Sequence, residues 1–323
     1  MQDLNHASDL RRRYCIFFKG FTGILGLLAQ SRFNNASPAI IDSPAAGPEN
    51  IAVKHFRTMV RRILPRFAVE AYYGYRESKL IDLNRRMNTE EVFTDIYSNN
   101  RWGGASGSFF SGAGSHEATI VGPYVAGVKR ELERIGADSM TVIDLGCGDF
   151  SVGRQIAPQC GRYVGVDIVK PLVDHNRKIF GNSGVSFVHA NMVTDDLPDG
   201  DVCLVRQVFQ HLSNDQILAV LPKLDRYRYS FVTEHHPSDA HLRQPNADKP
   251  HGGGTRARQQ SGVFLDQPPF DFPSARYRLL LQVPGPSIPR GIDPGVIRTF
   301  VLAGAGHPAV YQPAGGFPVK TAN

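Results

Sequence analysis

Two glycines and a set of aspartates, spaced over two predicted strands, are the residues of this chain best suited to bind a small ligand. The apolar run at residues 142–145 predicts a short buried strand, which Gly146 and Gly148 end. A strand, a glycine turn and a helix in this order bring backbone N–H groups close to a ligand. A second predicted strand, residues 163–167, ends on Asp167. This carboxylate lies 19 residues after Gly148, about where a nucleoside-binding fold places a ribose-binding acid.

The residues of the glycine turn separate two kinds of cofactor. A dinucleotide-binding turn has a third glycine in the pattern G-x-G-x-x-G, and that position is Ser151 in this chain. Asp149 would also place a carboxylate beside the phosphates of a dinucleotide. S-adenosylmethionine has no phosphate and carries a cationic amino group and a sulfonium, so an acidic turn suits it better. A dehydrogenase is therefore the disfavoured alternative.

The same segments carry a family resemblance. D-L-G-C-G-D-F at residues 144–150, followed by V-G-V-D at residues 164–167, resembles motifs one and two of class I S-adenosylmethionine-dependent methyltransferases. Together with W-G-G, S-G-A-G-S-H-E, R-Q-V-F-Q-H-L-S and T-E-H-H-P, they resemble a bacterial branch often found with polysaccharide or glycan biosynthesis genes. The resemblance covers about residues 54–303. Phe150 departs from the pattern, because many members of the superfamily carry a third glycine there.

The resemblance implies S-adenosyl-L-methionine as the cofactor and assigns ten residues to its site. Gly146 and Gly148 would let the backbone approach the methionine moiety, and Asp144 would orient the turn and the amino group. Asp167 would accept hydrogen bonds from both ribose hydroxyls. The remaining residues are Asp149 in the acidic turn, Ile168 on the adenine, Asn191 and Met192 at the edge and face of the adenine, and Arg206 and Gln207 on the sulfonium side.

Three residues near the fourth and fifth predicted strands are candidate catalytic residues. His211 is the first candidate for a general base, because it follows a strand end at the ligand crevice and histidine has an unperturbed pKa of about 6.5. Glu234 and His235, after the fifth predicted strand, are candidates for a base or a substrate ligand. For His211, a structural hydrogen bond at a helix start is the open alternative. No ligand spacing in the chain indicates a metal site.

A glycine-rich loop precedes the first strand. Residues 99–117 contain Trp102, the only tryptophan, and the segment S-G-A-G-S. An aromatic residue amid adaptable backbone is typical of functional loops, so we expect this loop to cap the pocket. Trp102 would then stack on the apolar face of a sugar ring, and a flexible surface loop is the alternative.

Alternating apolar segments predict the architecture. The expected class is α/β: a Rossmann-like, seven-stranded class I methyltransferase fold, mostly parallel with a terminal antiparallel hairpin and with helices on both faces. Helices are expected at residues 89–97, with Thr89 as N-cap, and at 122–136, 171–180 and 215–224; strands are expected at 142–145, 163–167, 185–189, 201–205, 229–233, 276–282 and 295–301. The predicted parts are a poorly ordered N-terminal extension (1–50), a helical N-terminal segment with the pocket-capping loop (51–120), the S-adenosylmethionine-binding methyltransferase domain (121–303) and a C-terminal tail (304–323).

The distribution of charge bears on partners. The net charge of +6 arises in residues 1–80, which hold 12 Lys and Arg against 6 Asp and Glu, whereas the remainder holds 24 of each. The domain is therefore neutral, and no nucleic-acid partner is expected. A weak membrane-surface contact of the basic N-terminal region stays open. The four cysteines form no C-x-x-C pair, which favours reduced thiols in a cytoplasmic protein.

The sequence thus predicts a methyltransferase that acts on a small-molecule acceptor, a hydroxyl of a sugar or glycan precursor, with an amine as the less favoured acceptor group. RNA or protein methylation is one alternative; neither N-P-P-Y nor D-P-P-Y follows the fourth predicted strand, where residues 206–209 read R-Q-V-F. A non-catalytic cofactor-binding scaffold with the same fold is the other. The oligomeric state is not predicted.

Overall fold

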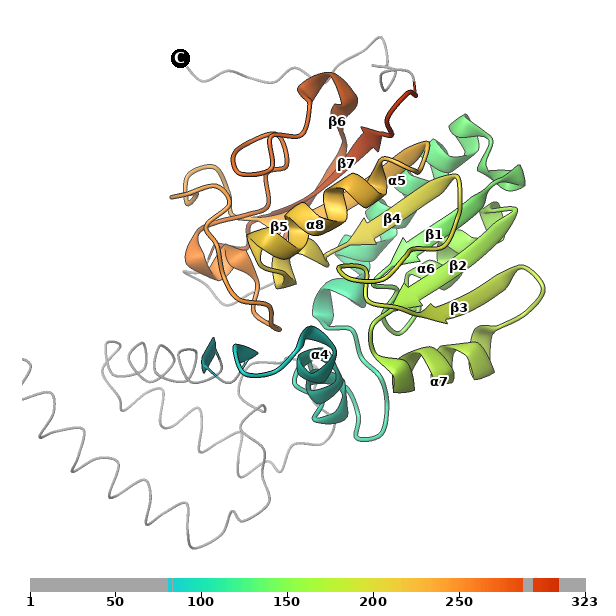
Figure 1. The fold of residues 1–323 in the computed structure, drawn as a ribbon, viewed down its shortest axis with the longest axis horizontal. Coiled ribbons are helices and arrows are strands. Elements are labelled where there is room, and N and C mark those ends of the chain that lie inside the picture. Colours follow the sequence, from blue (N-terminus) through green and yellow to red (C-terminus); the bar gives the residue numbers. More distant parts are fainter. Residues whose placement is uncertain (1–80, 83, 287–292, 308–323) are drawn as a thin grey trace, which may run out of the picture. The chain divides into compact units, whose positions relative to one another are not determined.

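A seven-stranded sheet organises the described part of the chain. The computed structural model describes residues 81–82, 84–286 and 293–307. Strand order is β3-β2-β1-β4-β5-β7-β6 (Figure 1), with β1 to β5 parallel and β6 and β7 antiparallel. The strands are β1 Thr141–Leu145, β2 Arg162–Asp167, β3 Val185–His189, β4 Val202–Arg206, β5 Tyr229–His236, β6 Tyr277–Pro284 and β7 Val296–Ala303. The predicted class I methyltransferase topology is therefore confirmed.

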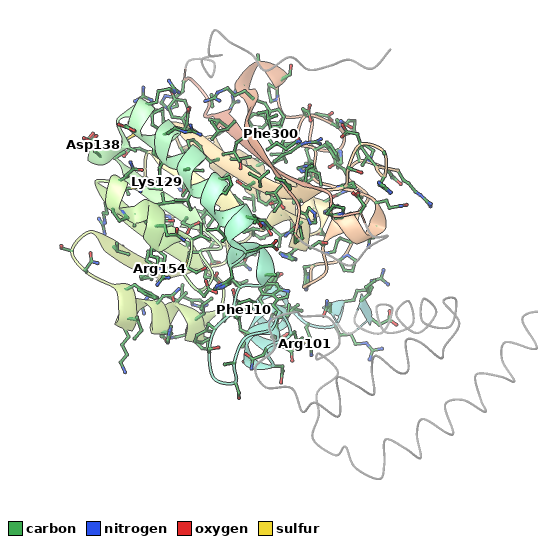
Figure 2. The ribbon with its side chains drawn as sticks, turned by 180° about the vertical axis from the view of Figure 1, so that it is seen from behind. Arg101, Phe110, Lys129, Asp138, Arg154 and Phe300 are labelled. Carbon is green, nitrogen blue, oxygen red and sulfur yellow. The ribbon has the colours of Figure 1, made fainter. Side chains whose placement is uncertain are left out.

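Helices cover both faces of this sheet. They are α4 Thr89–Ser98, α5 Ala118–Ile135, α6 Gly153–Ile156, α7 Lys170–Phe180 and α8 Asn214–Leu224. Side chains of a strand alternate between faces: Ile143 of β1 packs in one apolar cluster with residues of α4 and α8, and Val142 packs in a second cluster with residues of α5. The two views agree, since α8 lies in front of β4 in Figure 1 and α5, which carries Lys129, lies in front of the sheet in Figure 2.

Two helix boundaries differ from the prediction for local reasons. Asn88, not Thr89, is the N-cap of α4: its side chain accepts from Glu91 N at 2.9 Å, and the Glu91 side chain accepts from Asn88 N at 2.8 Å. This reciprocal pair is a capping box. Helix α5 begins at Ala118, before the predicted residue 122, and ends where Gly136 takes a left-handed conformation with φ of 75°.

The fifth strand is longer than predicted. Its pairing with β7 extends from Tyr229 opposite Ala303 to His236 opposite Val296. Glu234 and His235 therefore lie within β5, and the prediction that they follow the strand is wrong. The cause is nonlocal, because hydrogen bonding to a strand some sixty residues later extends β5 beyond its own apolar run.

Other predictions fall wholly or partly outside the described residues. The extension at residues 1–50, the part of segment 51–120 before residue 81, and the tail after residue 307 belong to this group. Within the described ranges, no helix has the length and apolarity needed to cross a membrane. The same ranges contain no group of three or more His, Cys, Asp or Glu side chains placed to hold a metal ion.

Candidate functional site

A cavity lies at the carboxyl ends of β1, β2 and β4. It is walled by the glycine turn after β1, by α4, by the loop before α5 and by the segment after β4. All ten residues predicted to bind the cofactor line this cavity: Asp144, Gly146, Gly148, Asp149, Asp167, Ile168, Asn191, Met192, Arg206 and Gln207. Of the three predicted catalytic residues, His211 lines the cavity and Glu234 and His235 do not.

The glycine turn is shaped for close approach. Gly146 and Gly148 have φ of 75° and 55°, a left-handed region that side chains with a Cβ rarely adopt. A Cβ on Gly146 would lie 2.5 Å from Val208 Cγ2, and one on Gly148 would overlap Ser111 Oγ. Both glycines are therefore required by backbone conformation and by space. Val208 and Ser111 pack directly against these glycines, and the turn that contains them, the glycine cradle, lines the cavity.

Asp167 holds the turn from the end of β2. One carboxylate oxygen accepts from Gly148 N at 3.0 Å and the other from Val169 N at 3.0 Å. Burial raises the pKa of Asp167, and the backbone N–H groups oppose that rise. A carboxylate fixed in this way keeps lone pairs free at the cavity wall, as a partner for hydroxyl groups.

Asp144 supplies a second buried carboxyl at the end of β1. Tyr163 donates its hydroxyl to Asp144 Oδ2 at 2.8 Å. Burial raises the pKa of Asp144 to about 6, against the lowering effects of Tyr163 and the nearby Arg206 guanidinium. That guanidinium also lies 4.9 Å from the ring centroid of Tyr124. The end of β1 thus offers negative charge suited to a cationic group.

Phe150 has a left-handed backbone conformation, as a glycine would at this position, where many members of the superfamily carry one. Its φ is 63°, in the left-handed region, although phenylalanine has a Cβ. The ring is buried and packs against three aromatic rings, with centroid distances of 5.7 Å to Tyr163, 5.3 Å to Phe180 and 4.9 Å to Phe187. This packing compensates the backbone strain, so the turn survives the departure from the family pattern.

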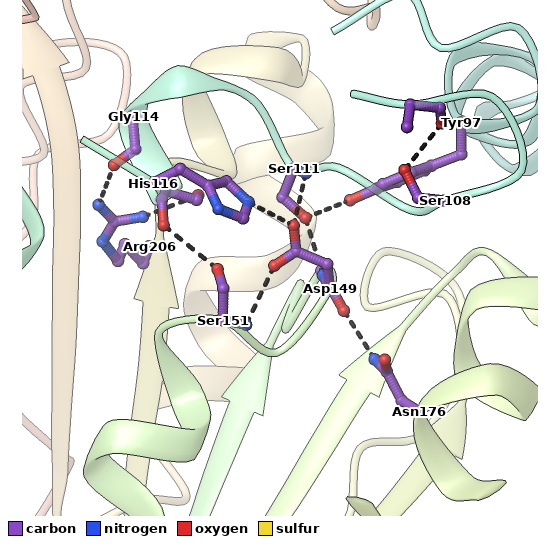
Figure 3. Close-up of polar contacts among 12 residues, drawn as sticks. Tyr97, Ser108, Ser111, Gly114, His116, Asp149, Ser151, Asn176 and Arg206 are labelled. Atoms are coloured by element: carbon purple, nitrogen blue, oxygen red, sulfur yellow. Dashed lines mark hydrogen bonds and ion pairs between the residues drawn. The ribbon is translucent and has the colours of Figure 1, made fainter. Parts of the chain in front are cut away.

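Asp149 binds the loop before α5 (Figure 3). Its Oδ2 accepts from Ser111 N at 2.8 Å and lies 2.7 Å from His116 Nε2, while its own backbone N donates to Ser111 Oγ at 2.8 Å. The Tyr97 hydroxyl lies 2.8 Å from the same Ser111 Oγ. Burial acts to raise the pKa of Asp149, but hydrogen bonds from Ser151, Ser111 and His116 outweigh it and the pKa is lowered.

Arg206 binds the same loop from the end of β4. Its guanidinium donates to the carbonyl of Gly114 at 2.6 Å and to Ser115 Oγ at 3.1 Å (Figure 3). Asp149 and Arg206, both predicted as cofactor residues, therefore hold the loop across the cavity. The sequence predicted that the loop containing Ser111 and His116 caps the pocket, but it predicted no partner for either residue. Their partner Asp149 lies 38 residues after Ser111 and 33 residues after His116.

His211 lies in an aromatic enclosure formed by α4 and the glycine-rich loop. Its ring centroid is 5.3 Å from Trp102 and 6.2 Å from Phe93. His211 Nδ1 is 3.2 Å from the carbonyl oxygen of Gly252. The backbone N–H of Gly252 in turn donates to the backbone carbonyl of His211 at 2.9 Å. Burial, and to a lesser degree the charge of Lys249, lowers the pKa of His211 to about 3. The ring is therefore neutral at physiological pH.

The carboxylate of Glu234 is held by hydrogen bonds from backbone N–H groups. It accepts three backbone N–H groups at the start of the short 3-10 helix Phe209–His211: from Val208 at 3.2 Å, Phe209 at 2.8 Å and Gln210 at 3.0 Å. Burial raises the pKa of Glu234 to about 8, and these three donors oppose the rise. Since both oxygens accept from backbone N–H groups and Glu234 does not line the cavity, we do not assign Glu234 a chemical role.

His235 also lies apart from the cavity. Its Nε2 is 2.7 Å from the carbonyl oxygen of Pro294, and burial lowers its pKa. Of the three candidate catalytic residues, only His211 therefore lines the cavity.

Residues 142–227, from β1 to the segment after α8, match a family model described as a methyltransferase domain. A search of curated proteins found no match. Among solved structures, the methyltransferase domain of bacterial CtHen1 is similar at 17% identity over 56% of this chain and 97% of that chain, with a TM-score of 0.40.

Two further similar structures are methyltransferases by name. Magnesium protoporphyrin IX methyltransferase from Synechocystis PCC 6803, with bound SAH, is 14% identical over 68% of this chain and 100% of that chain, with a TM-score of 0.43. Human N-acetylserotonin methyltransferase, in complex with SAM, is 14% identical over 68% of this chain and 60% of that chain, with a TM-score of 0.37. The domain match identifies the catalytic class as a methyltransferase, with S-adenosylmethionine as its cofactor.

Proposed function

We propose that this S-adenosylmethionine-dependent methyltransferase transfers a methyl group to a hydroxyl of a small acceptor, a sugar or glycan precursor. The observation that supports it best is His211, a neutral histidine at the cavity wall. In the tautomer with its proton on Nδ1, the ring donates to the Gly252 carbonyl oxygen, which lies 3.2 Å from that atom. Nε2 is then the lone-pair atom, available to take a proton from an acceptor hydroxyl.

The residues of the cavity fit the cofactor by their chemistry. The glycine cradle admits the methionine moiety, and Asp144 supplies negative charge for its amino group. Asp167 presents oxygen lone pairs for the ribose hydroxyls, and Ile168 and Met192 offer apolar surface for the adenine. When bound, S-adenosylmethionine supplies a methyl carbon activated by its positively charged sulfur.

In the proposed reaction, His211 takes the proton of the acceptor and the cavity walls align the acceptor. The acceptor oxygen forms the new bond to carbon with one lone pair, the hydroxyl proton goes to His211 Nε2, and the electron pair of the broken C–S bond stays on sulfur. Trp102 and Phe93 offer flat apolar surfaces beside His211, on which the apolar face of a sugar ring can stack. Alignment by such surfaces supplies much of the rate of a displacement reaction.

The predicted partners and location belong to this proposal. A small-molecule or glycan acceptor suits a cavity walled by aromatic side chains, and a domain without net charge offers no basic stripe for a nucleic acid. We place the enzyme in the cytoplasm, where its three described cysteines, Cys147, Cys160 and Cys203, would remain the free thiols that the structure shows.

The test is an acceptor screen with a matched variant. Wild type is incubated with S-adenosylmethionine and a panel of sugars and sugar nucleotides, and release of S-adenosylhomocysteine is measured. His211→Asn keeps an N–H donor for the Gly252 carbonyl but removes the base, so kcat should fall, by no more than about 10²-fold because a base with so low a pKa is weak. Affinity for S-adenosylhomocysteine should be unchanged. A variant with wild-type kcat would contradict the assignment of His211 as the base.

A further inference from the structure

Gln207, the residue after β4, holds an unusual position at the cavity. Its φ is 54°, a left-handed conformation that is rare for a residue with a Cβ. Its side-chain Nε2 is buried and has no hydrogen-bond partner among the described residues. Gly114 of the loop lies directly over the amide, because a Cβ at that position would be 2.7 Å from Gln207 Oε1. A buried amide donor is costly to leave unpaired, so a partner from outside the protein is expected.

The contacts of Gln210 show which atom of the Gln207 amide has no partner. In the tautomer with the proton on Nδ1, His211 Nε2 can only accept, and Gln210 Nε2 lies 3.4 Å away as the donor. The same Gln210 Nε2 lies 3.5 Å from Gln207 Oε1, which accepts from it. Although both bonds are long, each pairs a donor with an acceptor. The unpaired atom of Gln207 is therefore the donor Nε2 and not the oxygen.

The two side chains differ in what they offer to a ligand. Gln210 Nε2 lies within 3.5 Å of both His211 Nε2 and Gln207 Oε1, so these residues border the same part of the cavity. His211 Nε2 offers a lone pair and Gln207 Nε2 offers a hydrogen. A ligand that satisfies both must donate one hydrogen bond and accept another.

A hydroxyl meets this requirement while it reacts and an amine does not. A hydroxyl oxygen has one hydrogen and two lone pairs: the hydrogen goes to His211, one lone pair forms the bond to carbon, and the second accepts from Gln207. A neutral primary amine has a single lone pair, which the bond to carbon consumes. Its nitrogen would leave Gln207 Nε2 buried and unpaired, which is unfavourable.

We infer that Gln207 is the specificity-determining residue that selects a hydroxyl over an amine as methyl acceptor, by donating from Nε2 to the acceptor oxygen. This inference rests on the proposed function, in which His211 takes the acceptor's proton. It assigns Gln207 to the acceptor and not to the cofactor, which differs from the role that the sequence resemblance implies.

The test uses a matched pair of small probes, phenol and aniline, which are similar in shape and uncharged at neutral pH. Wild type is incubated with S-adenosylmethionine and each probe, and kcat/KM is measured from the release of S-adenosylhomocysteine, because the amine differs from the hydroxyl only while its lone pair forms the bond to carbon. The quantity compared between variants is the ratio of kcat/KM for phenol to kcat/KM for aniline. Loss of the Gln207 donor should lower this ratio about tenfold, which corresponds to about 1.4 kcal/mol.

Two variants complete the experiment. Gln207→Glu keeps the size of the side chain but replaces the donor with an acceptor, so the phenol-to-aniline ratio of kcat/KM should fall about tenfold while S-adenosylhomocysteine affinity is retained. Gln282→Glu, the same change at an exposed residue of β6 that accepts from Arg298 at 2.8 Å, should behave as wild type.

Several outcomes would overturn the inference. An unchanged phenol-to-aniline ratio of kcat/KM in Gln207→Glu, or an equal fall of that ratio in Gln282→Glu, would each do so. Loss of S-adenosylhomocysteine binding in Gln207→Glu alone would return Gln207 to the cofactor site. Failure of folded wild type to bind S-adenosylhomocysteine would instead contradict the methyltransferase site itself, so the two failures are distinguishable.

Discussion

Replacement of Phe150 by glycine and by alanine tests whether the motif turn keeps a glycine conformation under an aromatic side chain. Phe150 has a φ of 63° and is 2% exposed, with three aromatic neighbours. Removal of a buried phenylalanine side chain costs about 3 to 5 kcal/mol, which both variants lose. A left-handed residue with a Cβ is strained by about 1 to 2 kcal/mol, and only glycine relieves that strain.

The difference in stability between Phe150→Gly and Phe150→Ala reports on the backbone strain. Glycine is ordinarily less stabilising than alanine by about 0.5 to 1 kcal/mol, because its unfolded chain has more freedom. At position 150 the relief of strain should reverse this order, so Phe150→Gly should be more stable than Phe150→Ala by about 0.5 to 1 kcal/mol.

Urea unfolding of four variants measures this order. The matched control is Phe187, a buried phenylalanine in the middle of β3 that packs on the Phe150 ring. At that extended position, Phe187→Gly should be less stable than Phe187→Ala. If the glycine variant is the less stable one at both positions, the reasoning about the left-handed turn is refuted.

Three further changes have expected outcomes. Gly148→Ala places a Cβ against Ser111 in a left-handed turn, so calorimetry should show at least about tenfold weaker S-adenosylhomocysteine binding. His116→Ala removes a partner of Asp149, so limited proteolysis should cleave residues 99–117 faster than in wild type, and equal rates would contradict the loop contact. Because the pKa of His211 is lowered to about 3, the unfolded state binds an extra proton below about pH 6.5 and stability falls as pH decreases toward 3. His211→Asn should reduce this slope by about 1.4 kcal/mol per pH unit in urea unfolding, and an unchanged slope would show that His211 is not the source.

The sequence predicted the sheet well because the signals for its inner strands are local. The runs at residues 142–145 and 163–167 are buried on both faces, and their observed bounds differ from the predicted ones by one residue. The strand-turn pattern also brought all ten predicted cofactor residues to one cavity, since the carboxyl ends of parallel strands meet at one edge.

Features that depend on distant partners escaped prediction. The length of β5, and with it the position of Glu234, is set by pairing with β7. The contact between Asp149 and His116 joins residues 33 positions apart in the sequence. The hydrogen bond from Trp102 to the Gly253 carbonyl joins residues 151 positions apart. No local pattern encodes such pairs, because the partners are far apart in the sequence and meet only in the tertiary structure.

The central claim is tested most directly by calorimetric titration with S-adenosylhomocysteine. Wild type should bind, and Asp167→Ala should bind at least about tenfold more weakly, a loss of about 1.4 kcal/mol. Asp174→Ala, a change at an exposed carboxylate of α7 with surface partners only, is the control and should bind as wild type does. No binding by folded wild type, or equal binding by wild type and Asp167→Ala, would contradict the account.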